Sequence, residues 1–371
     1  MLIGVPKEIK QGEFRVGLTP GSAREYVGHG HDVLVQAGAG AAIGFDDAAY
    51  RTAGAKIADT AEEIFTRADM IVKVKEPQSN EWPQLRQGQI LYTYLHLAAE
   101  PDLTKGLVET GVTAIAYETV TDAHGGLPLL APMSEVAGRL SIQAAAHCLE
   151  MHQGGSGVLI GGVPGVAPAR VVVIGGGVVG THAARMAIGL GAEVTILDRS
   201  LPRLRALDDL FNSKVRTLYS TGETLEDEVL SADAVIGAVL VPGAKAPKLV
   251  SRDMVSRMKT GSVLVDVAID QGGAFETSRA TTHAEPTFII DRVVHYCVAN
   301  MPGAAAATAT RSLNNATLAY GLALADHGLD ALEDPYLRAG LNTHQGHVTH
   351  PAVADAFGMA FWDPGTHRLA A

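Results

Sequence analysis

The sequence Arg170-Val-Val-Val-Ile-Gly-Gly-Gly-Val-Val-Gly180 reads as a buried strand that runs into a glycine-rich turn. Its glycines at Gly175, Gly177 and Gly180 follow the pattern G-x-G-x-x-G, and a helical run continues to about Leu190. In this pattern the first glycine permits a tight turn, the second lets a pyrophosphate approach the backbone, and the third lets helix and strand pack closely. The helix N-terminus adds N–H groups and a partial positive charge. The passage therefore predicts a dinucleotide-binding unit.

A second strand, Glu193–Leu197, follows this helix and ends at Asp198. A lone G-x-G-x-x-G pattern is weak evidence, but here strand, helix, second strand and acidic residue occur in the required order. The Asp198 carboxylate can accept hydrogen bonds from both ribose hydroxyls and would repel a 2′-phosphate. The sequence therefore favours NAD over NADP. The preference is not absolute, because the neighbouring Arg199 could partly accommodate that phosphate.

Composition limits the classes of protein that remain. The chain has 371 residues, enough for about two domains, and it is 47% hydrophobic and only 19% charged. Its net charge of −11 argues against a nucleic-acid partner, and no basic stretch contradicts this. The two cysteines, Cys148 and Cys297, provide neither a disulfide framework nor zinc-ligand spacing. We expect them to be buried small side chains in a reducing compartment.

No membrane segment is expected. The N-terminus opens like a strand and lacks the long apolar region of a signal peptide. The most apolar interior stretch, from Gly154 to Ala169, is rich in Gly and Pro and is broken by Arg170, so it is too short and irregular to span a bilayer. We therefore expect a soluble, cytoplasmic protein without a membrane partner.

The first 130 residues alternate strand and helix without a glycine fingerprint. The first helix has a good start signal, because Thr19 can cap it and Pro20 suits its first turn. Helices are expected at Gly21–His29 and Ala61–Ala68, among others. The expected strands are Leu2–Pro6, Asp32–Gln36, Met70–Val74, Gln89–Tyr94 and Thr113–Tyr117. This segment is predicted to be a second doubly wound unit.

The predicted fold class is α/β, with two doubly wound Rossmann-like domains, a cleft between them, and two long helices that link them. The Ala-rich linking helices are expected at Met133–Met151 and Ala304–His327. Residues 131–304 are expected to form the NAD-binding domain, and residues 1–130 with 305–371 are expected to form a discontinuous substrate domain. Further strands of the NAD-binding domain are expected at Val215–Tyr219, Ala234–Val241, Ser262–Ile269 and Thr287–Ile290. Such α/β enzymes bind ligands at the carboxyl ends of their parallel strands.

Two cationic residues are candidates for binding a small acid. Arg15 follows the first strand, and arginine can grip a carboxylate with two parallel N–H bonds. Taken alone, Arg15 reads as a solvated loop residue. Lys75 closes an apolar run just before Pro77, where it could bind a carboxylate or a carbonyl oxygen. The alternative for Lys75 is an ordinary charge at a strand end.

Two further residues are candidates for proton transfer. His96 ends the run that begins at Gln89, and an imidazole can donate and accept protons near neutral pH. Its alternative is a satisfied, partly buried histidine. Asp270 ends the apolar strand that begins at Ser262, where a carboxylate could act as a base for water or ammonia addition. Its alternative is a cap or turn residue ahead of Gly272.

The remaining chemistry-bearing residues show no recognisable arrangement. No cluster of His, Asp or Glu has the spacing of metal ligands, so no metal is expected. No G-x-S-x-G motif supports a hydrolase. Several other histidines are expected to be surface or loop residues: His29, His31, His124, His152, His283 and His295.

The chain resembles the bacterial L-alanine dehydrogenase family over essentially its full length. The resemblance rests on several motifs in order, including Arg15 within Glu13–Val16, Lys75 within Val74–Pro77 and His96 within Tyr94–Leu97. The other matching stretches are Gly4–Glu8, Ala116–Thr119, Leu130–Arg139, Gly161–Gly165, Val241–Pro247, Asp266–Gly273 and Cys297–Pro302. One departure is the Ala-rich start of the helix after Gly303, where relatives tend to have a Pro and a Thr/Ser-rich start.

The resemblance implies reversible, NAD-dependent oxidative deamination of L-alanine to pyruvate and ammonium, with glyoxylate as a further substrate that would give glycine. Arg15 and Lys75 would bind the substrate carboxylate and carbonyl, and His96 and Asp270 would handle protons. The family is commonly hexameric, so a homo-hexamer is expected. The implied cofactor site comprises Ser134, Gly175, Gly177, Val178, Val179, Gly180, Asp198, Arg203, Ser220, Val239, Leu240, Val267, Ala268, Ile269, Asp270, Arg279, Val298, Ala299, Asn300 and Met301.

Three other classes of protein remain as alternatives. The soluble NAD-binding part of a proton-pumping transhydrogenase shares this architecture, but it needs no amino-acid pocket. A non-catalytic NAD-sensing protein would be marked by loss of the carboxylate-binding or acid/base residues, and all four are present here. An opine or lysine-pathway dehydrogenase would take a larger substrate. Pocket volume or an assay would separate the last alternative.

Overall fold

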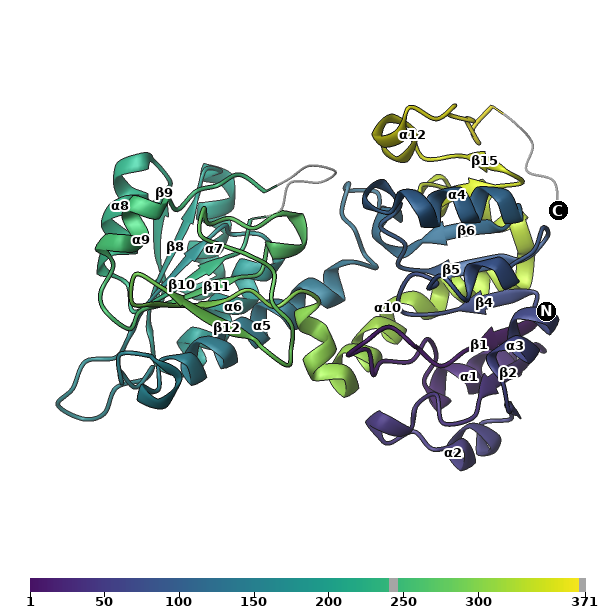
Figure 1. Ribbon diagram of the computed structural model, residues 1–371, viewed down its shortest axis with the longest axis horizontal. Helices are drawn as coiled ribbons and strands as arrows, with labels where there is room; N and C mark the ends of the chain where they lie inside the picture. The colour runs from purple at the N-terminus through teal and green to yellow at the C-terminus, as the bar shows by residue number, and fades with distance from the viewer. Residues whose placement is uncertain (240–245, 367–371) are drawn as a thin grey trace. The chain divides into compact units, whose positions relative to one another are not determined.

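A computed structural model of the chain describes residues 1–239 and 246–366. The chain divides into two compact units, of which unit 1 comprises Met1–Pro132 and Ala306–Ala371, and unit 2 comprises Met133–Ala305. The sequence analysis placed these boundaries after residues 130 and 304. Each unit is a doubly wound α/β domain (Figure 1), which confirms the predicted fold class. The cleft expected between the domains stays a prediction.

Unit 1 is built on a sheet of eight strands in the described residues, in the order β15-β14-β6-β5-β4-β1-β2-β3. The six strands from β6 to β3 are parallel, and β14 and β15 continue the sheet in antiparallel fashion. The strands are β1 (Leu2–Val5), β2 (Asp32–Gln36), β3 (Lys56–Ala58), β4 (Met70–Val72), β5 (Ile90–Thr93), β6 (Thr113–Ala116), β14 (Leu341–His344) and β15 (His347–Val348).

Helices cover both faces of this sheet. On one face, α3, α4 and α12 pack through a cluster that includes Phe65, Leu107 and Val353. On the other, the Tyr92 hydroxyl of β5 donates a hydrogen bond to the Thr317 carbonyl of α10 at 3.1 Å. The helices of unit 1 are α1 (Pro20–Gly28), α2 (Asp47–Thr52), α3 (Ala61–Arg67), α4 (Pro101–Thr110), α10 (Ala306–His327), α11 (Pro335–Arg338) and α12 (Pro351–Phe357).

The first helix begins as predicted. The Thr19 hydroxyl accepts a hydrogen bond from the Ser22 N–H at 3.0 Å, and Pro20 occupies the first helical position. Thr19 therefore caps the helix with a side-chain oxygen, as its residue type favours.

Unit 2 contains a sheet of seven strands in the described residues, in the order β12-β13-β11-β10-β7-β8-β9. All neighbours are parallel except β12 and β13, which form an antiparallel hairpin. The strands are β7 (Arg170–Ile174), β8 (Glu193–Asp198), β9 (Arg216–Tyr219), β10 (Ala234–Gly237), β11 (Val263–Asp266), β12 (Thr287–Ile290) and β13 (Val293–Tyr296).

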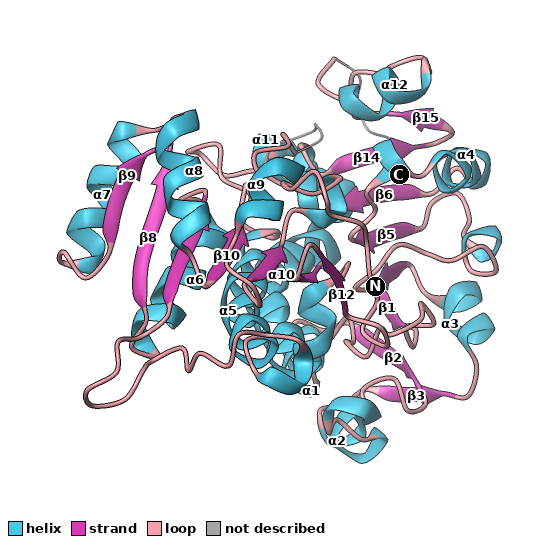
Figure 2. Cartoon of the chain, turned by 60° about the vertical axis from the view of Figure 1, so that its left-hand side comes forward, coloured by secondary structure: helices cyan, strands magenta, loops and turns pink. Residues whose placement is uncertain are grey.

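Alternate residues of β7 point into two separate hydrophobic clusters. Val171 and Val173 pack in the cluster of α5, α6 and α7, whereas Val172 and Ile174 pack in that of α8 and α9. Strands buried on both faces are hydrophobic throughout, which explains the unbroken apolar run. The helices, seen around the sheet in Figure 2, are α5 (Ala131–Cys148), α6 (Val178–Gly189), α7 (Leu201–Phe211), α8 (Gly222–Ser231) and α9 (Arg252–Arg257).

Each sheet contains a point where the strand order reverses. In unit 1 the chain runs from β1 outward to β3 and then returns to β4 on the other side of β1. In unit 2 it runs from β7 to β9 and returns to β10 on the other side of β7. Ligands of doubly wound folds bind outside the carboxyl ends of the strands at such points. The fold thus directs attention to the residues that follow β1, β4, β7 and β10.

Several predicted elements end earlier than expected, and others were missed. The expected strands Ala234–Val241 and Ser262–Ile269 end at Gly237 and Asp266. The helix expected at Met133–Met151 ends at Cys148, and a separate 3₁₀ turn follows. The helix expected to begin at Ala304 begins at Ala306 instead, as α10. The residues before it, Met301–Ala305, form a 3₁₀ turn. The missed strands are β3, β13, β14 and β15.

Candidate active site

In the glycine-rich turn of unit 2, close packing leaves no room for a side chain at two of the three motif glycines, and there is room for one at the third. Gly175 has φ +103°, and a Cβ there would lie 2.7 Å from the Ala238 carbonyl oxygen after β10. A Cβ on Gly180 would lie 1.8 Å from the Gly175 carbonyl oxygen. A Cβ on Gly177 would meet no atom within 4 Å. The space beside Gly177 is therefore open where the motif places a pyrophosphate, so the turn fits a dinucleotide.

Asp198 and Arg203 flank this turn. The Asp198 carboxylate accepts the Gly176 N–H at 2.7 Å and the Ser200 N–H at 2.8 Å. The Arg203 guanidinium donates to the Gly176 carbonyl at 2.6 Å and to the Thr181 hydroxyl at 2.6 Å. The carboxylate is thus fixed at the end of β8, where a ribose would be recognised.

Other predicted cofactor residues also lie near the carboxyl edge of this sheet. The Ser220 N–H donates to the Asp198 carbonyl at 3.0 Å, and the Val267 N–H donates to the Gly237 carbonyl at 3.0 Å. The Arg279 guanidinium lies over the Phe288 ring, 4.2 Å from its centroid. Leu240 lies outside the described residues. Contact of this set with a cofactor stays a prediction.

The position expected for Asp270 was wrong, because β11 ends four residues before it. Asp270 is exposed in a 3₁₀ turn, Ile269–Gln271. The strand ends at Asp266, whose fully buried carboxylate accepts the N–H groups of Ala268 at 3.1 Å and Ala274 at 2.9 Å. Burial raises the pKa of Asp266. Asp266 therefore shapes the loop that carries Asp270, a role that its place within an apolar run did not reveal.

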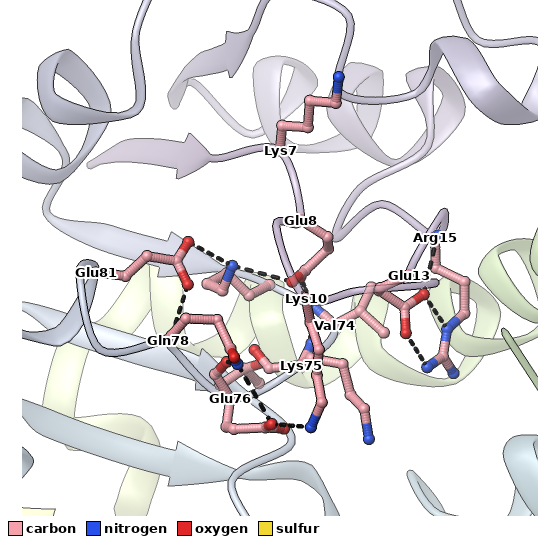
Figure 3. Close-up of polar contacts among 12 residues, drawn as sticks. Lys7, Glu8, Lys10, Glu13, Arg15, Val74, Lys75, Glu76, Gln78 and Glu81 are labelled. Atoms are coloured by element: carbon pink, nitrogen blue, oxygen red, sulfur yellow. Dashed lines mark hydrogen bonds and ion pairs between the residues drawn. The ribbon is translucent and has the colours of Figure 1, made fainter. Parts of the chain in front are cut away.

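In unit 1, Glu8 bridges the point where the strand order reverses. It follows β1, and its carboxylate accepts the N–H groups of Val74 at 2.7 Å and Lys75 at 3.2 Å, just after β4 (Figure 3). The same carboxylate accepts from the Lys73 ammonium at 3.0 Å, and Lys73 also donates to Glu81 at 2.9 Å. Glu8 thus fixes the backbone of Lys75 at the carboxyl edge of the sheet.

Lys73 itself is completely buried, which the sequence analysis did not anticipate. Burial alone would lower the pKa of Lys73, but the attraction of Glu8 and Glu81 more than offsets it and raises the pKa. The Lys73 ammonium therefore stays charged and pairs with the carboxylates of both Glu8 and Glu81.

Arg15 is only 2% exposed, so its interpretation as a solvated loop residue was wrong. Its guanidinium donates two hydrogen bonds to Glu13, at 2.7 Å from Nε and 2.5 Å from Nη2 (Figure 3). Burial opposes the charge of Arg15, but the hydrogen bonds and charge of Glu13 outweigh burial and raise its pKa. A guanidinium presents its N–H donors in a fixed fork, and Nε and Nη2 together hold both oxygens of the Glu13 carboxylate.

His96 lies beyond the end of its strand rather than at it, because β5 ends at Thr93. Its backbone adopts the left-handed region at φ +52°, uncommon for a residue other than glycine. Glu118 holds this turn by accepting the N–H groups of His96 at 2.5 Å and Leu95 at 3.2 Å. The imidazole is about half exposed, at 47%, and stacks parallel to the Tyr94 ring at 5.9 Å. An accessible, oriented imidazole suits proton transfer.

Unit 1 gathers Arg15, Lys75 and His96 around neighbouring strand ends. The Lys75 carbonyl accepts from the Thr93 hydroxyl at 2.9 Å, which joins the segment after β4 to β5. The Tyr94 ring stacks on His96, and burial raises the pKa of Tyr94, a rise that the charge of the Arg15 guanidinium partly opposes. Two cations and an imidazole near one sheet edge can bind an acid and move protons on it. Asp270, the fourth candidate, belongs to unit 2.

One expectation about the other histidines was also wrong. His295 lies in β13 and is completely buried rather than in a surface loop. Its Nδ1–H donates to the Val293 carbonyl at 3.0 Å, and its Nε2 accepts from the Thr277 hydroxyl at 2.7 Å. Burial lowers the pKa of His295. The ring is therefore a neutral structural group of the β12–β13 hairpin.

The prediction that both cysteines are buried is confirmed. Cys148 and Cys297 are both free and buried, and burial raises their pKa values to about 11 and about 12. Such thiols are poor nucleophiles. Within residues 1–239 and 246–366, no helix is long and apolar enough to cross a membrane.

Comparison with known proteins identifies the family of both parts of the chain. Residues 4–137 match the family described as "Alanine dehydrogenase/PNT, N-terminal domain". Residues 141–351 match "Alanine dehydrogenase/PNT, C-terminal domain". Together these matches include Arg15, Lys75 and His96 in the first segment and the glycine-rich turn in the second.

Individual relatives agree with this family. A protein named alanine dehydrogenase from Halomonas elongata is 61% identical over 363 residues, which cover 97% of this chain and 98% of the relative. A solved L-alanine dehydrogenase structure has a TM-score of 0.94 and 54% identity, covering 96% of this chain and 99% of that one. A solved transhydrogenase from Sinorhizobium meliloti is less similar, with a TM-score of 0.81, 26% identity, and coverage of 95% and 100%. The chain therefore belongs to the alanine dehydrogenase family.

Proposed function

We propose that this protein is an NAD-dependent L-alanine dehydrogenase, which reversibly converts L-alanine, water and NAD⁺ to pyruvate, ammonium, NADH and a proton. The observation that carries this proposal is the gathering of Arg15, Lys75 and His96 at the carboxyl edge of the unit 1 sheet, in a member of this family. Unit 2 supplies the glycine-rich turn and the carboxylate of Asp198 for the cofactor. The transhydrogenase alternative has weaker support, because the similarity to the solved transhydrogenase is much lower.

Arg15 and Lys75 are proposed to bind the substrate. The buried Arg15 guanidinium keeps its charge through Glu13 and would bind the carboxylate of pyruvate or alanine through paired N–H bonds. Lys75 is held by Glu8 through its backbone, and its ammonium would donate to the carbonyl oxygen. Polarising that carbonyl makes its carbon more susceptible to attack by ammonia.

His96 and Asp270 are proposed to move protons. In the aminating direction ammonia adds to the carbonyl carbon of pyruvate, and the resulting carbinolamine loses water to give an imine. His96 would take a proton from the incoming nitrogen and return one to the departing oxygen, and Asp270 would also take part in proton transfer. When bound, NADH would supply the hydride that reduces the carbon of the protonated imine, which gives L-alanine. General acid–base help of this kind contributes about 10²–10⁴-fold.

The remaining features follow from the same proposal. Asp198 would accept the ribose hydroxyls of NAD, and its negative charge would disfavour the 2′-phosphate of NADP. The protein is proposed to act in the cytoplasm as a homo-hexamer and to accept glyoxylate as well as pyruvate.

The experiment that tests this function follows NADH absorbance with purified protein and pyruvate, with and without ammonium. The proposal predicts NADH oxidation that depends on ammonium and yields alanine. Binding of NADH without turnover, for pyruvate and longer 2-oxo acids alike, would reject it and favour a transhydrogenase part or an NAD sensor. Turnover only with longer 2-oxo acids would indicate a dehydrogenase of larger substrates.

A further inference from the structure

The structure brings together three metal-binding side chains at the end of α5, in unit 2. His147 lies in the last turn of the helix, Glu150 follows it, and His152 lies in the 3₁₀ turn Met151–Gln153. One ligand atom from each residue lies within 4.8 Å of the other two, and in the described part of the chain this is the one such group of His, Cys, Asp or Glu. The sequence analysis missed the grouping because it depends on the chain turning sharply after α5.

We propose that His147, Glu150 and His152 form a surface site for a divalent transition metal of the zinc class. The Glu150 Oε2 atom lies 3.5 Å from His147 Nδ1 and 3.1 Å from His152 Nε2. Zinc binds nitrogen and oxygen ligands at about 2.0–2.2 Å in a tetrahedron, so two of its ligand atoms are roughly 3.4 Å apart. The Glu150 oxygen is therefore spaced to share one ion with either histidine, the ligand nitrogens of the two histidines lie within 4.8 Å of each other, and water would complete the coordination.

The donor set selects the kind of metal. Two imidazole nitrogens and one carboxylate oxygen suit Zn²⁺, Co²⁺ or Ni²⁺, whereas Mg²⁺ and Ca²⁺ prefer oxygen ligands alone. The two imidazole rings are 6.0 Å apart and inclined at 72°, so they do not stack and both can direct a nitrogen toward the carboxylate. The site also lies at the C-terminal end of an 18-residue helix, where the helix dipole favours a cation.

The backbone that carries the ligands is already ordered. The Glu150 N–H donates to the His147 carbonyl at 3.1 Å, and the Gly155 N–H donates to the Glu150 carbonyl at 3.1 Å. A Cβ on Gly155 would lie 2.2 Å from the Cys148 carbonyl oxygen, so the chain folds tightly back beneath the turn. Metal binding would therefore order few additional groups, which favours affinity.

The ligands are accessible to metal from solution. The side chains of His147, Glu150 and His152 are 59%, 49% and 68% exposed. None of them belongs to the residues proposed for substrate or cofactor binding, so the metal site is independent of the proposed activity. The bound ion would clamp the end of α5 to the turn that follows it and stabilise unit 2.

The test uses the full chain, purified without a polyhistidine tag and stripped of metal with a chelator. Isothermal titration calorimetry with zinc chloride should show one equivalent of saturable binding that is lost in the double variant His147→Gln/His152→Gln. Each single variant should bind zinc at least about tenfold more weakly. The matched control is His124→Gln, which changes an exposed histidine of unit 1 and should keep the full stoichiometry.

Thermal unfolding gives an independent readout, because a ligand that binds only the folded state raises the midpoint of unfolding. Zinc should raise the midpoint of the wild type and of His124→Gln, and should raise it less in the double variant. NADH binding by each variant checks that it is folded. Zinc stoichiometry and a midpoint shift that are the same in the double variant as in the wild type would overturn the proposal, as would no saturable zinc binding by the wild type.

Discussion

His96 has a left-handed backbone because a carboxylate from another segment holds it there. Glu118 accepts the N–H groups of both Leu95 and His96, and this bends the chain immediately after β5. A strained backbone at the end of a strand commonly marks a functional position. Here it turns the imidazole onto the Tyr94 ring and leaves it about half exposed. The residue is thus oriented and accessible, as a proton-transfer group must be.

The first prediction concerns the variant His96→Gln. Glutamine keeps hydrogen-bonding groups but cannot exchange protons near neutral pH, so kcat should fall by about 10²–10⁴-fold. The dissociation constant of NADH should stay nearly unchanged, because His96 belongs to unit 1 and the glycine-rich turn to unit 2. Steady-state kinetics and NADH fluorescence titration measure the two quantities. Near-wild-type turnover would show that His96 does not handle protons.

The second prediction concerns the preference for NAD. Asp198→Asn keeps an oxygen that can accept the Gly176 N–H but removes the negative charge. The ratio of kcat/KM for NADP to kcat/KM for NAD should rise at least about tenfold, equivalent to about 1.4 kcal/mol. The control is Asp209→Asn, an exposed aspartate of α7 in the same unit. An unchanged ratio in Asp198→Asn would mean that this carboxylate does not select the cofactor.

At the scale of elements, the loops after β1 and β4 are joined by buried charges. Lys73 is completely buried between Glu8 and Glu81, and Glu8 in turn binds the backbone of Val74 and Lys75. Removing one member of such a network leaves uncompensated charge in the interior, which costs more than the network contributes when intact. The position of Lys75 therefore depends on residues that the substrate does not touch.

The third prediction is that Lys73→Met destabilises unit 1 strongly. Two buried carboxylates would lose their shared cation, and the free energy of unfolding should fall by about 3–5 kcal/mol. The matched control is Lys56→Met, whose ion pair with Asp32 is largely exposed and should contribute little. Urea unfolding followed by circular dichroism measures both. Equal effects of the two substitutions would contradict the importance assigned to the buried cluster.

The fourth prediction concerns pH and the β12–β13 hairpin. Burial lowers the pKa of His295 in the folded protein, whereas an unfolded histidine titrates near 6.5. The unfolded state therefore binds more protons below about pH 6.5, so this residue reduces stability as the pH falls from there through its folded pKa. His295→Gln can keep both hydrogen bonds without titrating. Its midpoint of thermal unfolding should fall less between pH 7 and pH 5 than that of the wild type, and an equal fall would contradict the argument.

At the scale of the whole molecule, the sequence predicts patterns that are local along the chain. The strand, turn and helix around Gly175 have fixed spacing and are found where expected, as is the Thr19 cap. The strands β14 and β15 were missed because they are short and add antiparallel to a sheet whose other strands all end at or before Ala116, whereas β14 begins at Leu341. Nothing in their own sequence specifies that pairing.

In the candidate site too, the sequence predicts local features but not contacts between distant segments. Arg15, Lys75 and His96 could be proposed from their places after apolar runs, and the structure gathers them at one sheet edge. Their supporting carboxylates Glu13 and Glu118 were not proposed. Glu118 lies 22 residues from His96 and acts only through the folded chain, so sequence spacing carries no signal of it. The role of Asp266 was missed for a different reason. An aspartate within an apolar run is expected to be an ordinary strand residue, and the run gives no sign that its carboxylate binds the following loop.

The most direct test of the central claim follows the hydrogen on the reacting carbon. The protein would be incubated with NAD and L-alanine deuterated at C2, and the NADH formed would be analysed by mass spectrometry. An L-alanine dehydrogenase transfers that deuterium to the nicotinamide, so the NADH should carry it, and D-alanine should give no NADH. Formation of unlabelled NADH, or no NADH from either enantiomer, would contradict the proposed function.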